Sequence, residues 1–117
     1  MCGILGIYNL NGAPIDKNSL VEMGNQINHR GPDGEGHFVQ ANLGLVHKRL
    51  AILDPTDKGQ QPMHSKDRKW VIVFNGCIYN FKQLREELIQ KGHTFQTETD
   101  TEVICEGLDE YGTSFFE

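Results

Sequence analysis

The chain has 117 residues, which is enough for one domain, or part of one, with a single modest core. Apolar residues make up 38% of it and charged residues 23%, a composition that favours a packed domain over disorder. A net charge of −5 without a long Lys/Arg cluster argues against a nucleic-acid-binding surface, and no apolar run is long enough to span a membrane.

The counts of cysteine and histidine bear on metals and on the cellular compartment. The three cysteines lie far apart with no CxxC pair, and the five histidines show no metal-ligand spacing. We therefore expect neither a disulfide framework nor a metal site. This cysteine usage favours a reducing, cytoplasmic compartment.

The first predicted elements are a strand and a helix. Residues 2–8, CGILGIY, are apolar with β-branched and aromatic members and predict a mostly buried strand. After an Asn-Gly turn at residues 11–12, Asp16 is the expected N-cap of a helix that ends near His29. Its apolar positions recur at helical spacing: Leu20, Met23 and Ile27.

The middle of the chain predicts a loop, a hairpin and a long excursion. Residues 29–36, HRGPDGEG, hold three glycines and a proline and predict a loop. Residues 37–53 are dense in apolar positions that often alternate, so we expect two strands that form a hairpin. Residues 54–69 are polar with Pro and Gly, and loops of this length are often functional.

The last third predicts two strands and two helices. Residues 70–74, WVIVF, read as the clearest buried strand, and residues 93–97 as a short one. Between them Asn80 caps a helix that Gly92 ends, and Thr99 or Asp100 opens the last helix. The side chains expected to face inward are Phe81, Leu84, Leu88, Ile89, Val103, Ile104 and Leu108. Strands and helices in this order indicate an α+β fold.

Cys2 follows the initiator methionine directly, and this position has two interpretations. Removal of Met1 would leave an α-amine with a pKa of about 7.7–8.0 on the residue that carries a thiol of about 8.5. Nucleophile and general base would then lie on one residue, as in Thr–N-terminal amine pairs. The alternative is a core cysteine in a buried strand, which position alone favours.

Four further residues have both a chemical and a structural interpretation. Asn75 and Gly76 offer a side-chain amide and an unobstructed backbone N–H, donors that build an oxyanion hole, or they form a plain turn. Arg49, in an otherwise apolar run, either extends its guanidinium to solvent or pairs with a carboxylate, and the residue alone favours a structural ion pair. Asp100 caps a helix or holds an ammonium group.

Six stretches in a fixed order carry a family resemblance. They are MCGILGI, NHRGPDGEG, LGLVHKRLAILD, GQQPM, VFNGCIYNF and FQTETDTEVI. With these stretches the chain resembles the class II glutamine amidotransferases, and specifically the N-terminal glutaminase domain of the asparagine synthetase family. The likeness runs from Met1 to about Tyr111. It implies hydrolysis of L-glutamine to glutamate and ammonia through a cysteinyl thioester.

The resemblance implies a role for each matching residue. Cys2 matches the nucleophile that loss of Met1 exposes, and Asn75 and Gly76 match the oxyanion-hole pair. The residues implied in glutamine binding are Arg49 for the α-carboxylate, backbone groups from Leu50 to Leu53, Asp100 for the α-amino group, and Asn75, Gly76 and Cys77.

The implied site also includes a flap and one position that departs from the family pattern. Arg30 and Gly31 belong to the loop that resembles the flap ordering over bound glutamine. The family usually carries glutamate where this chain has Cys77, so we expect weakened or altered glutamine binding or coupling.

The resemblance also implies a larger assembly. The family fold is the N-terminal-nucleophile hydrolase αββα sandwich of antiparallel sheets, of which residues 1–117 would be the N-terminal part of the domain, so the chain is expected to be truncated. The synthetase domain that receives ammonia and uses ATP and Mg²⁺ would be absent, and exposed sheet edges would favour a homo-oligomer. The alternative function is a non-catalytic fragment that acts as an interaction or regulatory module.

Overall fold

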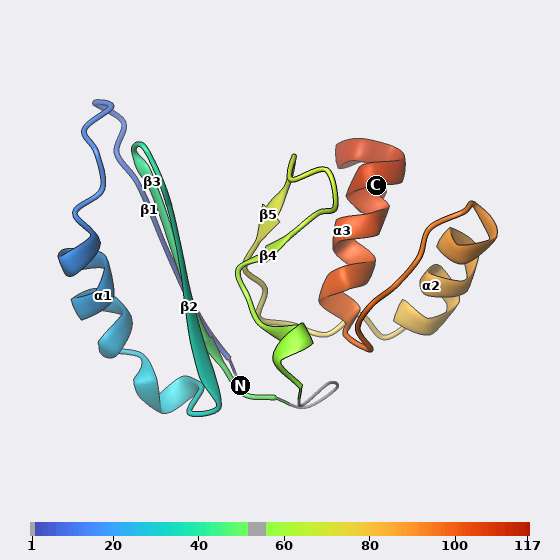
Figure 1. Ribbon diagram of the computed structural model, residues 1–117, viewed down its shortest axis with the longest axis horizontal. Helices are drawn as coiled ribbons and strands as arrows, with labels where there is room; N and C mark the ends of the chain where they lie inside the picture. The colour runs from blue at the N-terminus through green and yellow to red at the C-terminus, as the bar shows by residue number, and fades with distance from the viewer. Residues whose placement is uncertain (1, 52–55) are drawn as a thin grey trace. The chain divides into compact units, whose positions relative to one another are not determined.

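The computed structural model describes residues 2–51 and 56–117. Within these residues it holds three α-helices and two antiparallel sheets, as expected for an α+β chain (Figure 1). The chain divides into two compact units. The first comprises residues 1–51, 60–62 and 73–75, and the second residues 52–59, 63–72 and 76–117.

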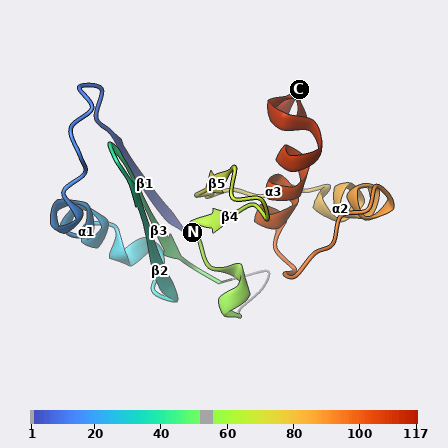
Figure 2. The same ribbon diagram turned by 45° about the horizontal axis from the view of Figure 1, so that its top comes forward.

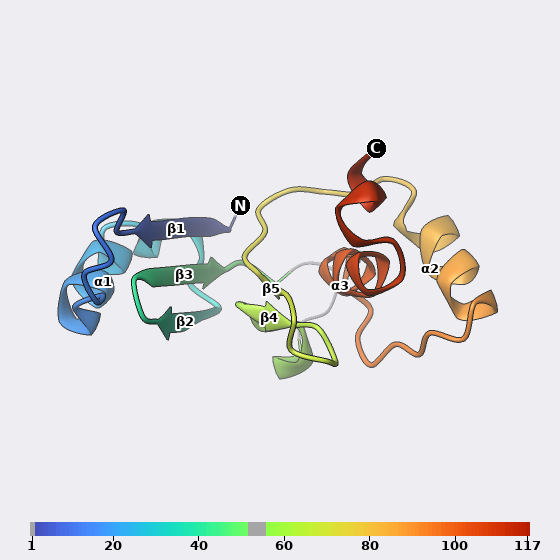
Figure 3. The same cartoon turned by 90° about the horizontal axis from the view of Figure 1, so that it is seen from above.

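The first unit is built on a three-stranded antiparallel sheet. Its strands, in the spatial order β1-β3-β2, are β1 (Gly3–Tyr8), β3 (Leu43–Arg49) and β2 (Gly34–Gln40), as Figure 3 shows. β2 and β3 form the expected hairpin, in which Gln40 pairs with Leu43. The central strand β3 has neighbours on both sides and contains a fully buried Val46.

Helix α1 (Lys17–Asn25) packs against β3 on one face of this sheet (Figure 1). The Asp16 carboxylate caps it by accepting the N–H of Asn18 at 3.1 Å, as predicted. Of its apolar positions, Leu20 is fully buried, whereas Met23 is 45% exposed. The helix ends at Asn25, earlier than the expected end near His29, since the Gly24-Asn25 pair has low helix propensity.

The glycine-rich stretch 29–36 is only in part the predicted loop. A 3₁₀ turn covers Asn28–Arg30, and strand β2 already begins at Gly34. A Cβ at Gly36 would collide with the Gln61 carbonyl oxygen. Glycine in this strand therefore lets another segment approach the backbone closely. Composition alone does not distinguish such a strand from a glycine-rich loop.

The second unit contains a small two-stranded sheet where a longer strand was expected. Strand β4 (Met63–His64) pairs with β5 (Val71–Ile72), so the prediction of a buried strand over residues 70–74 is wrong in length and in burial. In the described chain β5 has only this two-residue partner, and Val73–Asn75 belongs to the first unit. The predicted excursion over residues 54–69 also contains a 3₁₀ turn over Asp57–Gly59.

Helix α2 (Phe81–Gln90) follows the prediction except on one face. Leu88 is 2% exposed, but Ile89, predicted to face inward, is 49% exposed because it lies about 100° around the helix from Leu88. Asn80 stands at the N-cap without a side-chain hydrogen bond. At the other end Gly92, with φ +99°, allows the His93 N–H to reach the Leu88 carbonyl at 3.0 Å.

Helix α3 (Asp100–Tyr111) packs against α2 and provides the core of the second unit (Figure 2). The Thr99 hydroxyl caps it, and the predicted inward positions are buried, namely Val103, Ile104 and Leu108. The predicted strand over residues 93–97 is wrong. The backbone N–H groups of Gln96 and Thr97 donate to the Glu102 carboxylate instead, which occupies the groups that a sheet would pair.

A 3₁₀ segment, η3 (Gly112–Phe116), follows α3. Phe115 turns back onto the helix, where a Cβ at Gly107 would lie 2.5 Å from its ring. Phe116 stays 67% exposed. In the described residues, none of the helices has the length and apolar character that a membrane span requires.

Candidate functional site

The Cys2 sulfur lies at the end of the first unit's sheet. Cys2 precedes β1, and the antiparallel pairing of Gly3 with Lys48 places it beside the residues that follow β3. Its Sγ accepts the N–H of Leu50 at 3.2 Å and lies 3.6 Å from the Leu50 carbonyl oxygen. The residue is partly exposed and its thiol is free. The pairing and the Leu50 hydrogen bond therefore fix the position of the sulfur.

Arg49 ends β3 immediately before the residue that holds the sulfur. It is 5% exposed, although a guanidinium is rarely buried to this extent without a polar environment. The loop before β2 fixes its main chain, because Asp33 donates its N–H to the Arg49 carbonyl at 2.9 Å and accepts the Ala51 N–H at 2.8 Å. Leu53, also predicted to bind glutamine, lies outside the described residues.

Gly31 of the predicted flap lies directly against β3. It is buried, and a Cβ there would collide with the Lys48 carbonyl and the Arg49 nitrogen. Arg30, its neighbour, lies beside Gly3 at the start of β1, where a Cβ on that glycine would meet the Arg30 side chain at 3.1 Å. The predicted flap thus contacts β3 next to Arg49 and the start of β1, directly after Cys2.

Two residues that the sequence analysis did not single out hold the main chain just before Asn75. The His47 Nε2 lies 3.3 Å from the Phe74 carbonyl oxygen, and the Phe74 N–H donates to the Gln61 side-chain oxygen at 2.6 Å. His47 is fully buried. Burial lowers the pKa of His47; the hydrogen bond with the Phe74 carbonyl opposes this in part, and the nearby Arg49 charge adds a smaller lowering effect.

The sequence contained a weak signal for both of these residues. His47 interrupts the apolar run of β3, as Arg49 does, and Gln61 stands in the stretch GQQPM. A histidine inside a strand has no metal-ligand spacing to draw attention to it, and Gln61 lies 13 residues from its partner Phe74. The contact could not be derived from local pattern.

Asp100 organises the corresponding part of the second unit. It is 6% exposed at the first position of α3, and its Oδ2 accepts the Ile78 N–H at 3.0 Å. Thr99, not Asp100, supplies the helix cap. The carboxylate thus holds the segment that contains Gly76 and Cys77, whose thiol is exposed and free.

The predicted site residues divide between the two units. The first unit contains Cys2, Arg30, Gly31, Arg49, Leu50 and Asn75. The second unit contains Gly76, Cys77 and Asp100. The hydrogen bonds of Cys2 with Leu50, and of Asp100 with Ile78, each lie within one unit.

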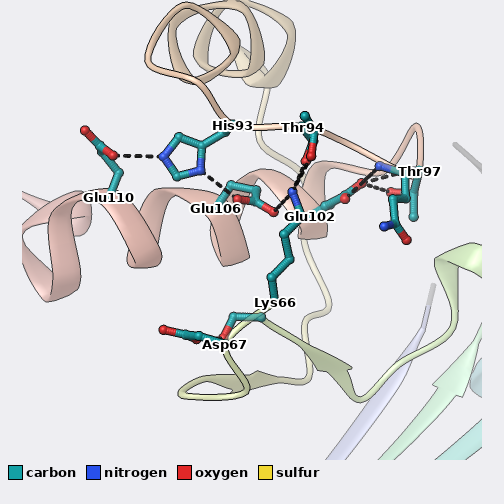
Figure 4. A network of polar contacts seen from close by, with 10 residues as sticks. Lys66, Asp67, His93, Thr94, Thr97, Glu102, Glu106 and Glu110 are labelled. Atoms are coloured by element: carbon teal, nitrogen blue, oxygen red, sulfur yellow. Dashed lines mark hydrogen bonds and ion pairs between the residues drawn. The ribbon is translucent and has the colours of Figure 1, made fainter.

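A polar network, absent from the sequence predictions, joins the segment after α2 and the β4–β5 turn to α3 in the second unit (Figure 4). His93 lies between two carboxylates, with Nδ1 2.7 Å from Glu106 and Nε2 2.8 Å from Glu110. Lys66 lies 3.0 Å from Glu106 and also bonds Thr94. The hydrogen bonds with Glu110 and Glu106 raise the pKa of His93.

We call this network the His93 clasp, and its contacts are those of a structural ion-pair network rather than of a metal centre. Its acidic groups pair with His93 and Lys66, and the two glutamates lie one turn apart on α3. In residues 2–51 and 56–117 no group of three or more His, Cys, Asp or Glu side chains is arranged to hold a metal ion.

Comparison with known proteins decides the family. The family model described as a glutamine amidotransferase domain matches residues 1–117. This chain belongs to the glutamine amidotransferase domain family. The match covers both units, and so includes every residue for which the sequence predicted a role.

Curated relatives place the domain near asparagine synthetases. The chain is 44% identical to "Asparagine synthetase [glutamine-hydrolyzing] 1" of Bacillus subtilis over 107 residues, which are 89% of this chain and 17% of that protein. It is 41% identical to "Asparagine synthetase [glutamine-hydrolyzing] 2" of Oryza sativa over 116 residues, 98% of this chain and 19% of that protein. The chain therefore spans about a fifth of the length of the curated relatives it matches.

Proposed function

We propose that this amidotransferase domain hydrolyses L-glutamine to glutamate and ammonia, with Cys2 as the nucleophile. The observation that carries the proposal is the position of the Cys2 sulfur, held by the Leu50 N–H one residue beyond the buried Arg49. The candidate nucleophile is thus held by the residue that follows the candidate cation for the substrate carboxylate, in a chain that belongs to the glutamine amidotransferase domain family.

The proposed reaction begins with removal of Met1. The freed α-amine of Cys2 accepts the thiol proton, and Sγ attacks the carbon of the glutamine side-chain amide. The tetrahedral intermediate collapses as the C–N bond breaks, the departing nitrogen takes the proton from the ammonium group, and ammonia leaves. Water then attacks the thioester, which releases glutamate and restores the thiol.

Negative charge develops on the amide oxygen in both tetrahedral intermediates. We assign its stabilisation to the side-chain NH₂ of Asn75 and the backbone N–H of Gly76, which are adjacent in the chain. A donor of this kind contributes on the order of 3 kcal/mol to the transition state in other hydrolases. Asn75 is suited to the task because its main chain is held at Phe74.

The charged ends of glutamine require one cation and one anion. Arg49 would bind the α-carboxylate through its planar fork, and Asp100 would hold the α-ammonium group. Backbone groups of Leu50 and Leu53 would complete the pocket. Arg30 and Gly31 would close over the substrate, and Cys77 would border it in place of the family's usual glutamate.

The destination of the ammonia is a separate part of the proposal. The curated relatives are named as glutamine-hydrolysing asparagine synthetases, and the chain corresponds to about a fifth of each. We assign the amide-forming step, with its ATP and Mg²⁺, to a synthetase domain that receives the ammonia. No step proposed for the present residues uses either cofactor.

The test compares glutamate release from glutamine by the wild-type chain and by Cys2→Ala. Intact mass first establishes that Met1 has been removed, and Cys105→Ala, which removes a buried thiol, is the matched control. We expect Cys2→Ala to abolish glutamate release and Cys105→Ala to retain it. Equal release by wild type and Cys2→Ala would refute the proposal and favour a non-catalytic interaction module.

A further inference from the structure

We propose that His47 is a positioning residue for Asn75, acting through the peptide group that joins Phe74 to Asn75. The inference about geometry stands on the contacts of the first unit, and its catalytic meaning rests on the proposed glutaminase function. His47, Gln61 and Phe74–Asn75 all belong to that unit.

The Phe74 main chain is held from both sides. Its N–H donates to the Gln61 side-chain oxygen at 2.6 Å, and its carbonyl oxygen lies 3.3 Å from the His47 Nε2. The strand pairing places Gly36 opposite His47, and the absence of a Cβ at Gly36 leaves room for the Gln61 backbone. The three elements form one device, which we call the Phe74 clamp: His47 on β3, Gly36 on β2, and Gln61.

The chemistry of the clamp fixes the state of the imidazole. A carbonyl oxygen only accepts, so Nε2 carries the hydrogen and donates it. Burial favours the neutral ring, and Nδ1 is buried with no hydrogen-bond partner among the described residues. A leucine would be buried here without that cost, so what the imidazole adds to the protein is the bond to Phe74.

The clamp matters to Asn75 because a peptide group is planar. The Phe74 carbonyl and the Asn75 N–H share one plane, so fixing the carbonyl fixes the direction in which the chain enters Asn75. An oxyanion-hole donor works only when it is held near the developing charge, and small displacements weaken it steeply. His47 thus orients the donor without touching the substrate.

The first test reads the clamp itself and needs no activity. Amide hydrogen exchange of the full chain is compared between wild type, His47→Leu and His47→Gln, whose side-chain amide can replace the Nε2–H donor. Val46→Ala, on the opposite face of the same strand, controls for general loss of stability. We expect exchange at residues 73–75 to rise at least about tenfold in His47→Leu alone. Unchanged exchange there, or the same rise in Val46→Ala, would overturn the proposal.

The second test reads the catalytic consequence. We expect His47→Leu to lower kcat for glutamine hydrolysis roughly tenfold or more, with KM changed less than about threefold, and His47→Gln to restore most of it. Alkylation of Cys2 by iodoacetamide, mapped by peptide mass, should keep its wild-type rate, because that reaction needs no oxyanion hole. A wild-type kcat in His47→Leu, or no recovery in His47→Gln, would refute positioning.

The two tests separate the two proposals. If the wild-type chain shows no Cys2-dependent hydrolysis, the glutaminase proposal fails, while the exchange result still decides whether His47 holds Phe74. If hydrolysis depends on Cys2 but exchange at residues 73–75 is the same in wild type and His47→Leu, the clamp proposal is refuted and the glutaminase proposal is supported.

Discussion

Gly31 packs directly against the main chain that joins Lys48 to Arg49, so closely that a single methyl group would not fit. The contact joins a loop from one part of the sequence to the end of the central strand. In the proposed site the Arg49 guanidinium binds the substrate carboxylate, and the Leu50 N–H bonds the Cys2 sulfur. The close packing of Gly31 therefore affects both folding and substrate binding.

We predict that Gly31→Ala lowers the free energy of unfolding by about 1–3 kcal/mol, the usual cost of overpacking, and raises the KM for glutamine. Urea unfolding and steady-state kinetics measure the two effects. Gly6→Ala on β1 is the matched control, since its Cβ would meet Leu45 at an ordinary 3.4 Å. Equal stability of the two variants would contradict the close contact.

Arg49→Lys is expected to raise the Kd for glutamine at least about tenfold, because an ammonium group cannot reproduce the two parallel N–H donors of a guanidinium. Isothermal titration with glutamine on a Cys2→Ala background measures binding without turnover. Arg85→Lys, in the Arg85–Glu98 ion pair of the second unit, provides the control and should bind normally. Unchanged affinity in Arg49→Lys would remove the carboxylate role.

The His93 clasp predicts a pH-dependent stability with a definite sign. Its folded pKa is raised by the Glu110 and Glu106 carboxylates, so its contribution is complete below the unfolded pKa of about 6.5 and is lost as pH rises through the folded pKa. Lys66 also faces Glu106, at 3.0 Å. We expect His93→Gln to cost about 1 kcal/mol at pH 5.5 and much less at pH 9.

Urea unfolding of wild type and His93→Gln across that pH range provides the measurement, with His29→Gln, an exposed histidine, as control. Fluorescence of Trp70, in the same unit, can follow the transition. A cost of His93→Gln that stays constant from pH 5.5 to pH 9 would show that the charged imidazole contributes nothing.

Thiol chemistry should separate the three cysteines. Burial, and then the charges of Glu102 and Glu106, raise the pKa of Cys105 to about 12, so at pH 8 only about one in 10⁴ of its thiols is ionised. We expect iodoacetamide to label Cys2 and Cys77 in the folded protein and Cys105 only after unfolding. Peptide mass mapping reads each site, and labelling of Cys105 at the rate of Cys77 would contradict its burial.

Sequence periodicity predicted the elements whose contacts are local or repeat regularly. The Asp16 cap, the β2–β3 hairpin and the buried positions Val103, Ile104 and Leu108 follow from spacing alone. The predicted strand over residues 93–97 failed because of a side-chain partner that periodicity does not reveal. The Glu102 carboxylate accepts the N–H groups of Gln96 and Thr97, which a sheet would otherwise pair.

In the candidate site, too, the sequence predicted some of the residues and not others. Position and residue type identified Cys2, Arg49 and Asp100, and the structure adds the contacts that hold them. It could not be deduced from the chain that His47 and Gln61 both reach Phe74, since those residues are 27 and 13 positions away. The catalytic and binding roles themselves stay predictions until the variants are measured.

The antiparallel register of β1 on β3 sets the position of the Cys2 thiol relative to Leu50. With Gly3 opposite Lys48, the first side chain before the strand meets Leu50, and a slip of one residue would carry it about 3.4 Å along and turn it to the other side of the sheet. Adding or deleting one residue within β1 should therefore abolish the activity proposed for Cys2 even if the fold survives. A lengthened hairpin turn at Ala41–Asn42 should leave the thiol in place.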